Sequence, residues 1–131
     1  MDIWKFYDIT HREHVVCNPI SEEKLARLVD LLRLPAGARV VDIACGKAEF
    51  LISLAEAYGI RGIGIYLSPF YTGEARKRLA ARAPDADVTI KEMDGADFKP
   101  DKPHSFVLAS CIGASWVYGG YPATLEALSN M

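Results

Sequence analysis

The sequence has no long hydrophobic run, no excess of charge of one sign and no paired cysteines. None of its apolar runs reaches the roughly 20 residues that a membrane span needs, so no membrane is expected. A net charge of −2 also gives no reason to expect nucleic acid as a partner. The three cysteines, Cys17, Cys45 and Cys111, form no C-x-x-C pair, and we expect no metal site. Free thiols are typical of a reducing compartment, which predicts a cytoplasmic protein.

The sequence also lacks the glycine-rich loop of dinucleotide-binding proteins. The stretch VVDIACGKAEF, residues 40–50, has a single glycine, Gly46, between Ala44 and Ala48. The G-x-G-x-x-G pattern would need small residues at positions 44, 46 and 49, and position 49 is glutamate. This spacing argues against a nicotinamide-dependent oxidoreductase.

What is present is a regular alternation of apolar strands and amphipathic helices in a chain long enough for one domain. The predicted strands are 38–44, 60–67, 86–93 and 105–113, and the predicted helices are 3–16, 21–33, 48–59, 68–83 and a last one from 122. This order predicts an α/β fold, a Rossmann-like parallel sheet with helices on both faces. Ligands of such sheets bind at the carboxyl ends of the strands, where the turn 44–48 lies.

The turn after the first strand combines an acid with a bare helix start. Small side chains leave the backbone N–H groups open to a ligand, and a helix beginning near Lys47 favours a carboxylate or a phosphate there. Asp42 would repel a pyrophosphate but accept hydrogen bonds from an ammonium group. A ligand with both a carboxylate and an ammonium, such as an amino-acid moiety, fits this pair.

Four motifs in order resemble the class I S-adenosylmethionine-dependent methyltransferases. VVDIACGKAEFL is similar to their first motif, and RGIGIYLSP to their second strand and the turn that follows it. ADVTIKEMDGADF resembles their third strand and its loop, and SFVLASCIGASWVYGGYPATLEAL resembles strand four of a subgroup with a CIGASW signature. The resemblance covers residues 20–131 and implies S-adenosyl-L-methionine as the cofactor.

The resemblance also implies roles for individual residues. Asp42 and the backbone of Ala44, Cys45 and Gly46 would hold the methionine end, Asp94 and Gly95 would contact the adenine, and Ser110 and Cys111 would pass beside the sulfonium. An N-terminal arm, residues 1–20, would cap the acceptor pocket of the core, residues 21–131. His11 or His14 would be the base if one is needed, since neutral imidazole takes a proton near pH 7.

The chain departs from the family pattern at four residues and in its number of strands. Ala44 and Ala48 replace glycines, and Tyr66 stands where the family has the acid that binds the ribose hydroxyls. Val107 stands where strand four of the family often begins with FD. The family sheet has seven strands, and we expect this one to be truncated after strand four. We then expect either that the apolar edge at strand four pairs with a second copy in a homo-oligomer, or that the chain is a fragment of a longer protein.

Two functions follow as expectations. The first is an S-adenosylmethionine-dependent methyltransferase that acts on a small-molecule acceptor. The alternative is a shortened or degenerate methyltransferase-like module without catalysis, which Tyr66, Ala48 and the missing strands motivate. The sequence also contains an aromatic group and a basic group of residues. The aromatic residues after strand four would either pack or line the acceptor pocket, and a basic run on the fourth helix is expected to be a solvated face; they are Trp116, Tyr118 and Tyr121, and Arg76, Lys77, Arg78 and Arg82.

Overall fold

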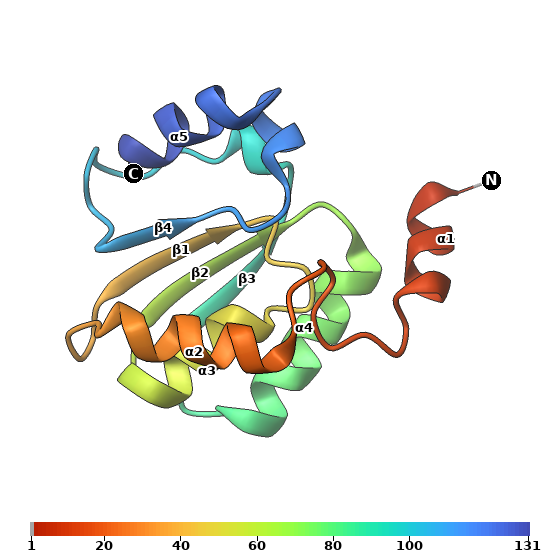
Figure 1. Ribbon diagram of the computed structural model, residues 1–131, viewed down its shortest axis with the longest axis horizontal. Helices are drawn as coiled ribbons and strands as arrows, with labels where there is room; N and C mark the ends of the chain where they lie inside the picture. The colour runs from red at the N-terminus through yellow and green to blue at the C-terminus, as the bar shows by residue number, and fades with distance from the viewer. Residues whose placement is uncertain (1) are drawn as a thin grey trace.

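Four parallel strands form the centre of the computed structural model, which describes residues 2–131 (Figure 1). The sheet order is β3-β2-β1-β4. The strands are β1 Arg39–Ile43, β2 Arg61–Tyr66, β3 Val88–Glu92 and β4 Leu108–Ser110, and the helices are α1 Ile3–Thr10, α2 Glu22–Leu32, α3 Glu49–Tyr58, α4 Pro69–Arg82 and α5 Tyr121–Ser129. Two short 3₁₀ turns cover Gly95–Asp97 and Ser115–Tyr118. The predicted Rossmann-like sheet is confirmed.

Each face of the sheet carries its own apolar layer, because the strands are buried on both sides. Helices α2, α3 and α4 cover one face, where Val40 and Ile90 of the sheet pack against Leu25, Leu51 and Leu54. Helix α5 and the two 3₁₀ turns cover the other face, around a cluster formed by Val41, Ile43, Ile65, Phe98 and Met131. Figure 1 shows the two layers above and below the sheet.

The register brings three strand tips together. Asp42 lies opposite Gly64 of β2 on one side and opposite Ser110 of β4 on the other. Ala44 and Tyr66 follow at the ends of β1 and β2, so the motif residues of three separate segments meet at one edge of the sheet.

Two predicted elements are shorter than expected. The arm helix ends at Thr10 rather than near residue 16, because the carbonyls of His11, Arg12 and His14 turn towards the ammonium group of Lys47. Strand β4 has only three residues. The N–H groups of Ser105 and Phe106 donate to the carbonyl of Met131 instead of extending the sheet.

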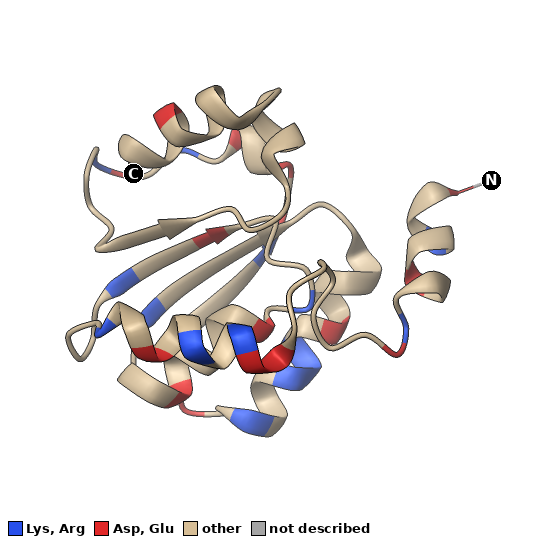
Figure 2. Cartoon of the chain, viewed as in Figure 1, with Lys and Arg blue, Asp and Glu red and all other residues tan. Residues whose placement is uncertain are grey.

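Helix α4 corrects one expectation about charge. Lys and Arg residues are frequent along this helix (Figure 2), and we expected a solvated face. Arg78 and Arg82 instead form ion pairs with Glu49 of α3, at 2.6 and 2.7 Å, and Arg76 donates to the carbonyl of Ile90. These arginines hold α3, α4 and β3 together, and only Lys77 of the run has no such partner among the described residues.

None of the helices within residues 2–131 is both long and apolar enough to cross a membrane. Strand β4 forms one edge of the described sheet. The prediction of a homo-oligomer through this edge stays a prediction.

Candidate functional site

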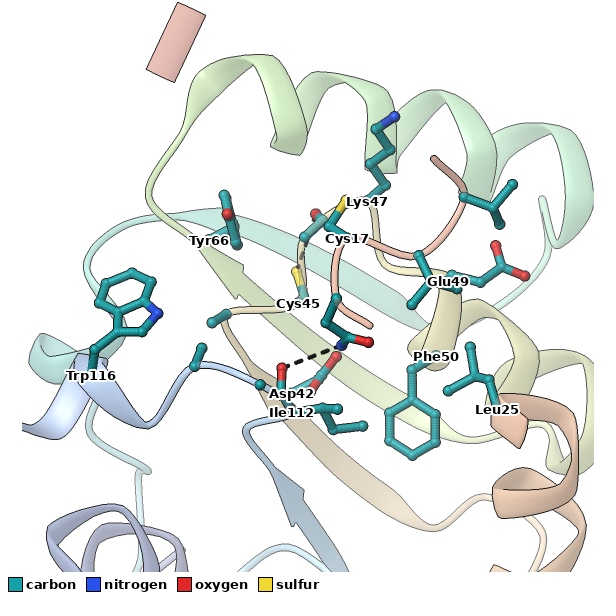
Figure 3. A pocket seen from close by; sticks show the side chains of 17 residues that line it. Cys17, Leu25, Asp42, Cys45, Lys47, Glu49, Phe50, Tyr66, Ile112 and Trp116 are labelled. Atoms are coloured by element: carbon teal, nitrogen blue, oxygen red, sulfur yellow. Dashed lines mark hydrogen bonds between the residues drawn. The ribbon is translucent and has the colours of Figure 1, made fainter. Parts of the chain in front are cut away.

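A buried carboxylate, that of Asp42, lies at the floor of a cavity over the strand tips (Figure 3). The side chain of Asp42 is 3% exposed, and its Oδ1 accepts a hydrogen bond of 2.7 Å from Ser110 Oγ. Burial raises the pKa of Asp42 to about 7, against the lowering effect of the Ser110 hydrogen bond. Its second oxygen has no donor within residues 2–131 and faces a cavity of about 130 Å³. A buried carboxylate with one free oxygen is suited to an ammonium group.

The turn after β1 presents free backbone donors to the same cavity. The N–H of Cys45 donates to Ile65 O and the N–H of Ala48 donates to Cys45 O. The N–H groups of Gly46 and Lys47, between them, have no partner in the part of the chain that the structure describes. Because these donors lie just before the start of α3, they favour a negatively charged group. The turn and Asp42 therefore suit opposite charges of one ligand.

Two alanines of this turn adopt left-handed backbone conformations. Ala44 has φ 58° and Ala48, the N-cap of α3, has φ 62°. A non-glycine residue pays about 1–2 kcal/mol for this conformation. The methyl group of Ala48 is fully buried in the core, which offsets part of that cost, whereas Ala44 is only half-buried. The family's glycines would therefore be preferred here on backbone grounds, most of all at position 44.

Replacing Ala44 with glycine is expected to raise the free energy of unfolding by about 1 kcal/mol, since it removes the left-handed penalty without leaving a buried hole. Urea denaturation measures the change. The matched control is Ala80→Gly on the exposed side of α4, where glycine should lower stability by about 1 kcal/mol. Equal losses at both positions would contradict the strain at Ala44.

A second cavity, of about 470 Å³, lies between the arm and the tip of β2. We call it the aromatic chamber; its lining residues are Ile3, Trp4, Tyr7, His11, Cys17, Tyr66, Tyr71 and Trp116. Three of them, Cys17, Tyr66 and Trp116, also line the cavity above Asp42. The two cavities are thus neighbours with common walls.

The arm is attached to the core by hydrogen bonds, since helix α1 has no buried residue. Lys47 is 7% exposed, and its Nζ donates to the carbonyls of His11, Arg12 and His14 at 2.7, 2.9 and 2.9 Å. In Figure 3 its side chain points away from Asp42. The residue next to Gly46 therefore fastens the arm to the turn of the cavity.

Helix α4 supplies two further attachments of the arm. The hydroxyl of Tyr71 donates to Tyr7 O at 3.1 Å, and Arg78 donates to Val15 O at 3.1 Å. All three attachments are made by core side chains to arm carbonyls. They fix the backbone of the arm and leave its rings free to line the chamber.

The two predicted histidines lie in contact. Nδ1 of His11 and Nδ1 of His14 are 2.9 Å apart, so one ring donates and the other accepts. His11 lines the aromatic chamber and His14 does not. Within residues 2–131, no third His, Cys, Asp or Glu joins them in a metal-binding group.

Asp94 and Gly95 lie beside a small third cavity of about 20 Å³, which Trp4 of the arm also lines. Oδ1 of Asp94 accepts from the N–H of Ala96 and so caps its own 3₁₀ turn. A methyl group on Gly95 would lie 2.6 Å from the side chain of Ile43, which only glycine avoids. Contact of these two residues with adenine stays a prediction.

The cysteines have neutral thiols. Burial raises the pKa of Cys45 well above its ordinary value and the pKa of Cys111 to about 11. Cys45 lines the cavity above Asp42, whereas Cys111 lies off the walls of all three cavities and donates to Ala114 O. Ser110 also lies off the walls of the cavity above Asp42 and reaches it only through its hydrogen bond to the Asp42 carboxylate. A thiolate nucleophile is not favoured at either cysteine.

Sequence reasoning did not identify two residues of this region. The sequence pattern places Lys47 at the start of a helix and gives no role to Asn18. Asn18 Nδ2 donates to Ile112 O at 3.4 Å, and both residues line the cavity above Asp42. Each contact joins segments that are far apart in the chain, and nothing in the local pattern signals it.

Comparison with known proteins identifies close similarities over nearly the whole chain. The mycolic acid cyclopropane synthetase family matches residues 11–114. The uncharacterized Escherichia coli protein YjhP is 33% identical over 130 residues, which are 99% of this chain and 52% of that protein.

Two crystal structures with bound S-adenosyl-L-homocysteine are similar in fold and sequence. A methyltransferase from Thiobacillus denitrificans has 39% identity and a TM-score of 0.90, with coverage of 99% of this chain and 52% of that one. A methyltransferase from Geobacter sulfurreducens has 34% identity and a TM-score of 0.89, with coverage of 97% and 51%. The chain therefore spans about half the length of these relatives.

Proposed function

Since the chain belongs to the class I S-adenosylmethionine-dependent methyltransferases, in the mycolic acid cyclopropane synthetase family, we propose that it binds S-adenosyl-L-methionine and takes part in methyl transfer. The observation that carries the proposal is that one cavity is bordered by both the free Asp42 oxygen and the free N–H groups of Gly46 and Lys47. These are the complementary groups for the ammonium and carboxylate of an amino acid.

The residues of the cavity fit the methionine end of this cofactor. Asp42 would hold the ammonium, and the turn of Cys45 and Gly46 would hold the carboxylate. Ser110 keeps the Asp42 carboxylate in place through its 2.7 Å hydrogen bond. When bound, the cofactor supplies an electrophilic methyl group on a sulfonium. The chain's own contribution is alignment and the exclusion of water.

The acceptor would occupy the aromatic chamber, which shares Tyr66 and Trp116 with the cavity above Asp42. His11 lines this chamber, and its contact with His14 through Nδ1 leaves its Nε2 available. We assign His11 the role of base for an acceptor that must lose a proton, with His14 as the partner that orients its ring. The acceptor is a small molecule in this proposal.

The alternative, a methyltransferase-like module without catalysis, has specific support. Tyr66 replaces the ribose-binding acid, Ala44 and Ala48 are strained in the turn, and the cavity beside Asp94 is only about 20 Å³. A neutral phenol, with its pKa raised by burial to about 12, lacks the charge-assisted bonds of a carboxylate. This alternative predicts very weak cofactor binding.

Calorimetric titration with S-adenosyl-L-homocysteine separates the two functions. We expect measurable binding by the wild-type chain and about tenfold tighter binding by Tyr66→Asp, because a carboxylate adds a charge-assisted bond of about 1.5–3 kcal/mol. Tyr66→Asn, which adds no charge, is the matched control. No heat at millimolar ligand in the wild type and in Tyr66→Asp would exclude the cofactor proposal, and equal affinities would exclude the ribose argument.

A further inference from the structure

The walls of the aromatic chamber are unusual in composition. Five of its eight lining residues carry Tyr or Trp rings, and both tryptophans of the protein, Trp4 and Trp116, are among them. The other three are Ile3, His11 and Cys17. No Asp, Glu, Lys or Arg lines it. The chamber is therefore large, ring-lined and without a fixed charge of either sign from those residues.

Four of the five Tyr and Trp rings of the chamber contact one another, and the fifth, that of Trp116, is free. The Tyr66 ring stacks on Tyr71, with centroids 5.0 Å apart, and meets Trp4 edge-on at 6.2 Å. Trp4 also lies 6.3 Å from Tyr7. Trp116 pairs with no ring among the described residues and is 63% exposed. A flat ligand can therefore stack on Trp116 without displacing an existing ring contact.

The Tyr66 hydroxyl and the Cys17 thiol are neutral hydrogen-bonding groups of the chamber. The hydroxyls of Tyr66 and Tyr7 have no partner within residues 2–131, whereas that of Tyr71 is used on Tyr7 O. Burial raises the pKa of Tyr66 to about 12 and also raises that of Cys17, so both groups are neutral near pH 7. The chamber can thus donate hydrogen bonds to a neutral oxygen and accept them from a hydroxyl.

We propose that the aromatic chamber binds a planar, uncharged aromatic compound that carries a hydroxyl group. The inference rests on the proposed function, in which this compound is the methyl acceptor. An anionic ligand would lose its hydration without meeting a lysine or arginine. A cation is best held by several bare ring faces, and of the five rings Trp116 alone has no ring contact among the described residues.

Three probes that share one ring system test this assignment. They are 2-naphthol, the anion 2-naphthoate and the cation 2-naphthyltrimethylammonium, titrated calorimetrically at pH 7.5. We expect 2-naphthol to bind at least tenfold more tightly than either charged probe. The two indole N–H signals of a ¹H–¹⁵N spectrum report the place of binding, since both tryptophans line the chamber, and both signals should shift.

Trp116→Ala is expected to weaken 2-naphthol binding about tenfold through the loss of the stacking surface. Tyr121→Ala, at an equally exposed aromatic residue outside the chamber, is the matched control and should leave binding unchanged. Tighter binding of either charged probe, or equal effects of the two variants, would overturn the assignment.

A parallel titration with S-adenosyl-L-homocysteine separates this inference from the proposed function. If S-adenosyl-L-homocysteine binds and 2-naphthol does not, the chamber assignment is overturned and the cofactor proposal stays intact. If 2-naphthol binds and S-adenosyl-L-homocysteine does not, the result supports the chamber assignment and contradicts the cofactor proposal.

Discussion

Replacing Asp42 with asparagine is expected to abolish S-adenosyl-L-homocysteine binding while making the ligand-free protein more stable. Asparagine keeps the shape of the side chain and an oxygen for the Ser110 hydroxyl. It removes the negative charge that would meet the ammonium, a loss of more than about 3 kcal/mol or hundredfold in affinity for a buried charge pair. Calorimetry at pH 8 measures the first effect.

The gain in stability follows from the pKa of Asp42, which burial raises from 3.8 to about 7. Below about pH 4 the Asp42 carboxyl is protonated in both the folded and the unfolded chain, and the fold is then most stable. As the pH rises from about 4 to 7, the unfolded chain releases this proton while the folded chain keeps it, so the free energy of unfolding falls until the folded carboxyl also ionises. The difference is about 4 kcal/mol. Above pH 7 the asparagine variant should therefore be more stable by that order.

Denaturation in urea between pH 4 and pH 8 tests this directly. The wild type should lose stability over this range relative to Asp42→Asn, and its affinity for S-adenosyl-L-homocysteine should rise as the carboxylate ionises near pH 7. Asp85→Asn, at an exposed loop acid, is the control and should change neither quantity. Parallel pH profiles of the wild type and Asp42→Asn would show that Asp42 titrates normally and would contradict the prediction.

Replacing Lys47 with methionine is expected to release the arm without unfolding the core. Methionine keeps the apolar stem but removes the ammonium group and its three bonds to the carbonyls of His11, Arg12 and His14. Hydrogen bonds from a charged group contribute about 1.5–3 kcal/mol each, and helix α1 buries no side chain that would compensate. We expect the arm to open at least a thousandfold more often, with faster amide exchange over residues 2–16.

Amide hydrogen exchange followed by mass spectrometry distinguishes arm release from general destabilisation. Peptides from β1 and α3 should exchange as in the wild type. Lys77→Met on α4 is the matched control, because Lys77 has no hydrogen-bonded partner among the described residues. Faster exchange in the sheet, or an unchanged arm, would show that the Lys47 contacts do not hold the arm in solution.

The sequence was sufficient for the sheet, the turn and Asp42 because their signals are local. A β-rich run followed by small residues and a helix predicts a strand, a turn and a ligand site at one place, and the structure has them within residues 39–58. The position of Tyr66 was also predictable, since it ends the neighbouring strand. What it contacts was not, because Tyr71 and Trp4 reach it from two different helices.

The attachment of the arm could not be predicted from the sequence for the same physical reason. Its attachment depends on Lys47, which lies 33–36 residues from the carbonyls that it binds, and on Tyr71, 64 residues from Tyr7. A carbonyl accepts from any donor that reaches it, so the sequence carries no pattern for such a contact. The length of β4 depends likewise on a bond between Ser105 and Met131.

The common walls at Tyr66 and Trp116 give the two cavities a thermodynamic consequence. A molecule in one cavity must change the surroundings that the other offers, so the two binding free energies are coupled. Linkage requires the factor by which S-adenosyl-L-homocysteine changes the affinity for 2-naphthol to equal the factor in the reverse direction. A cycle of four titrations would return one coupling constant, and its sign would tell whether the first occupant prepares or obstructs the second.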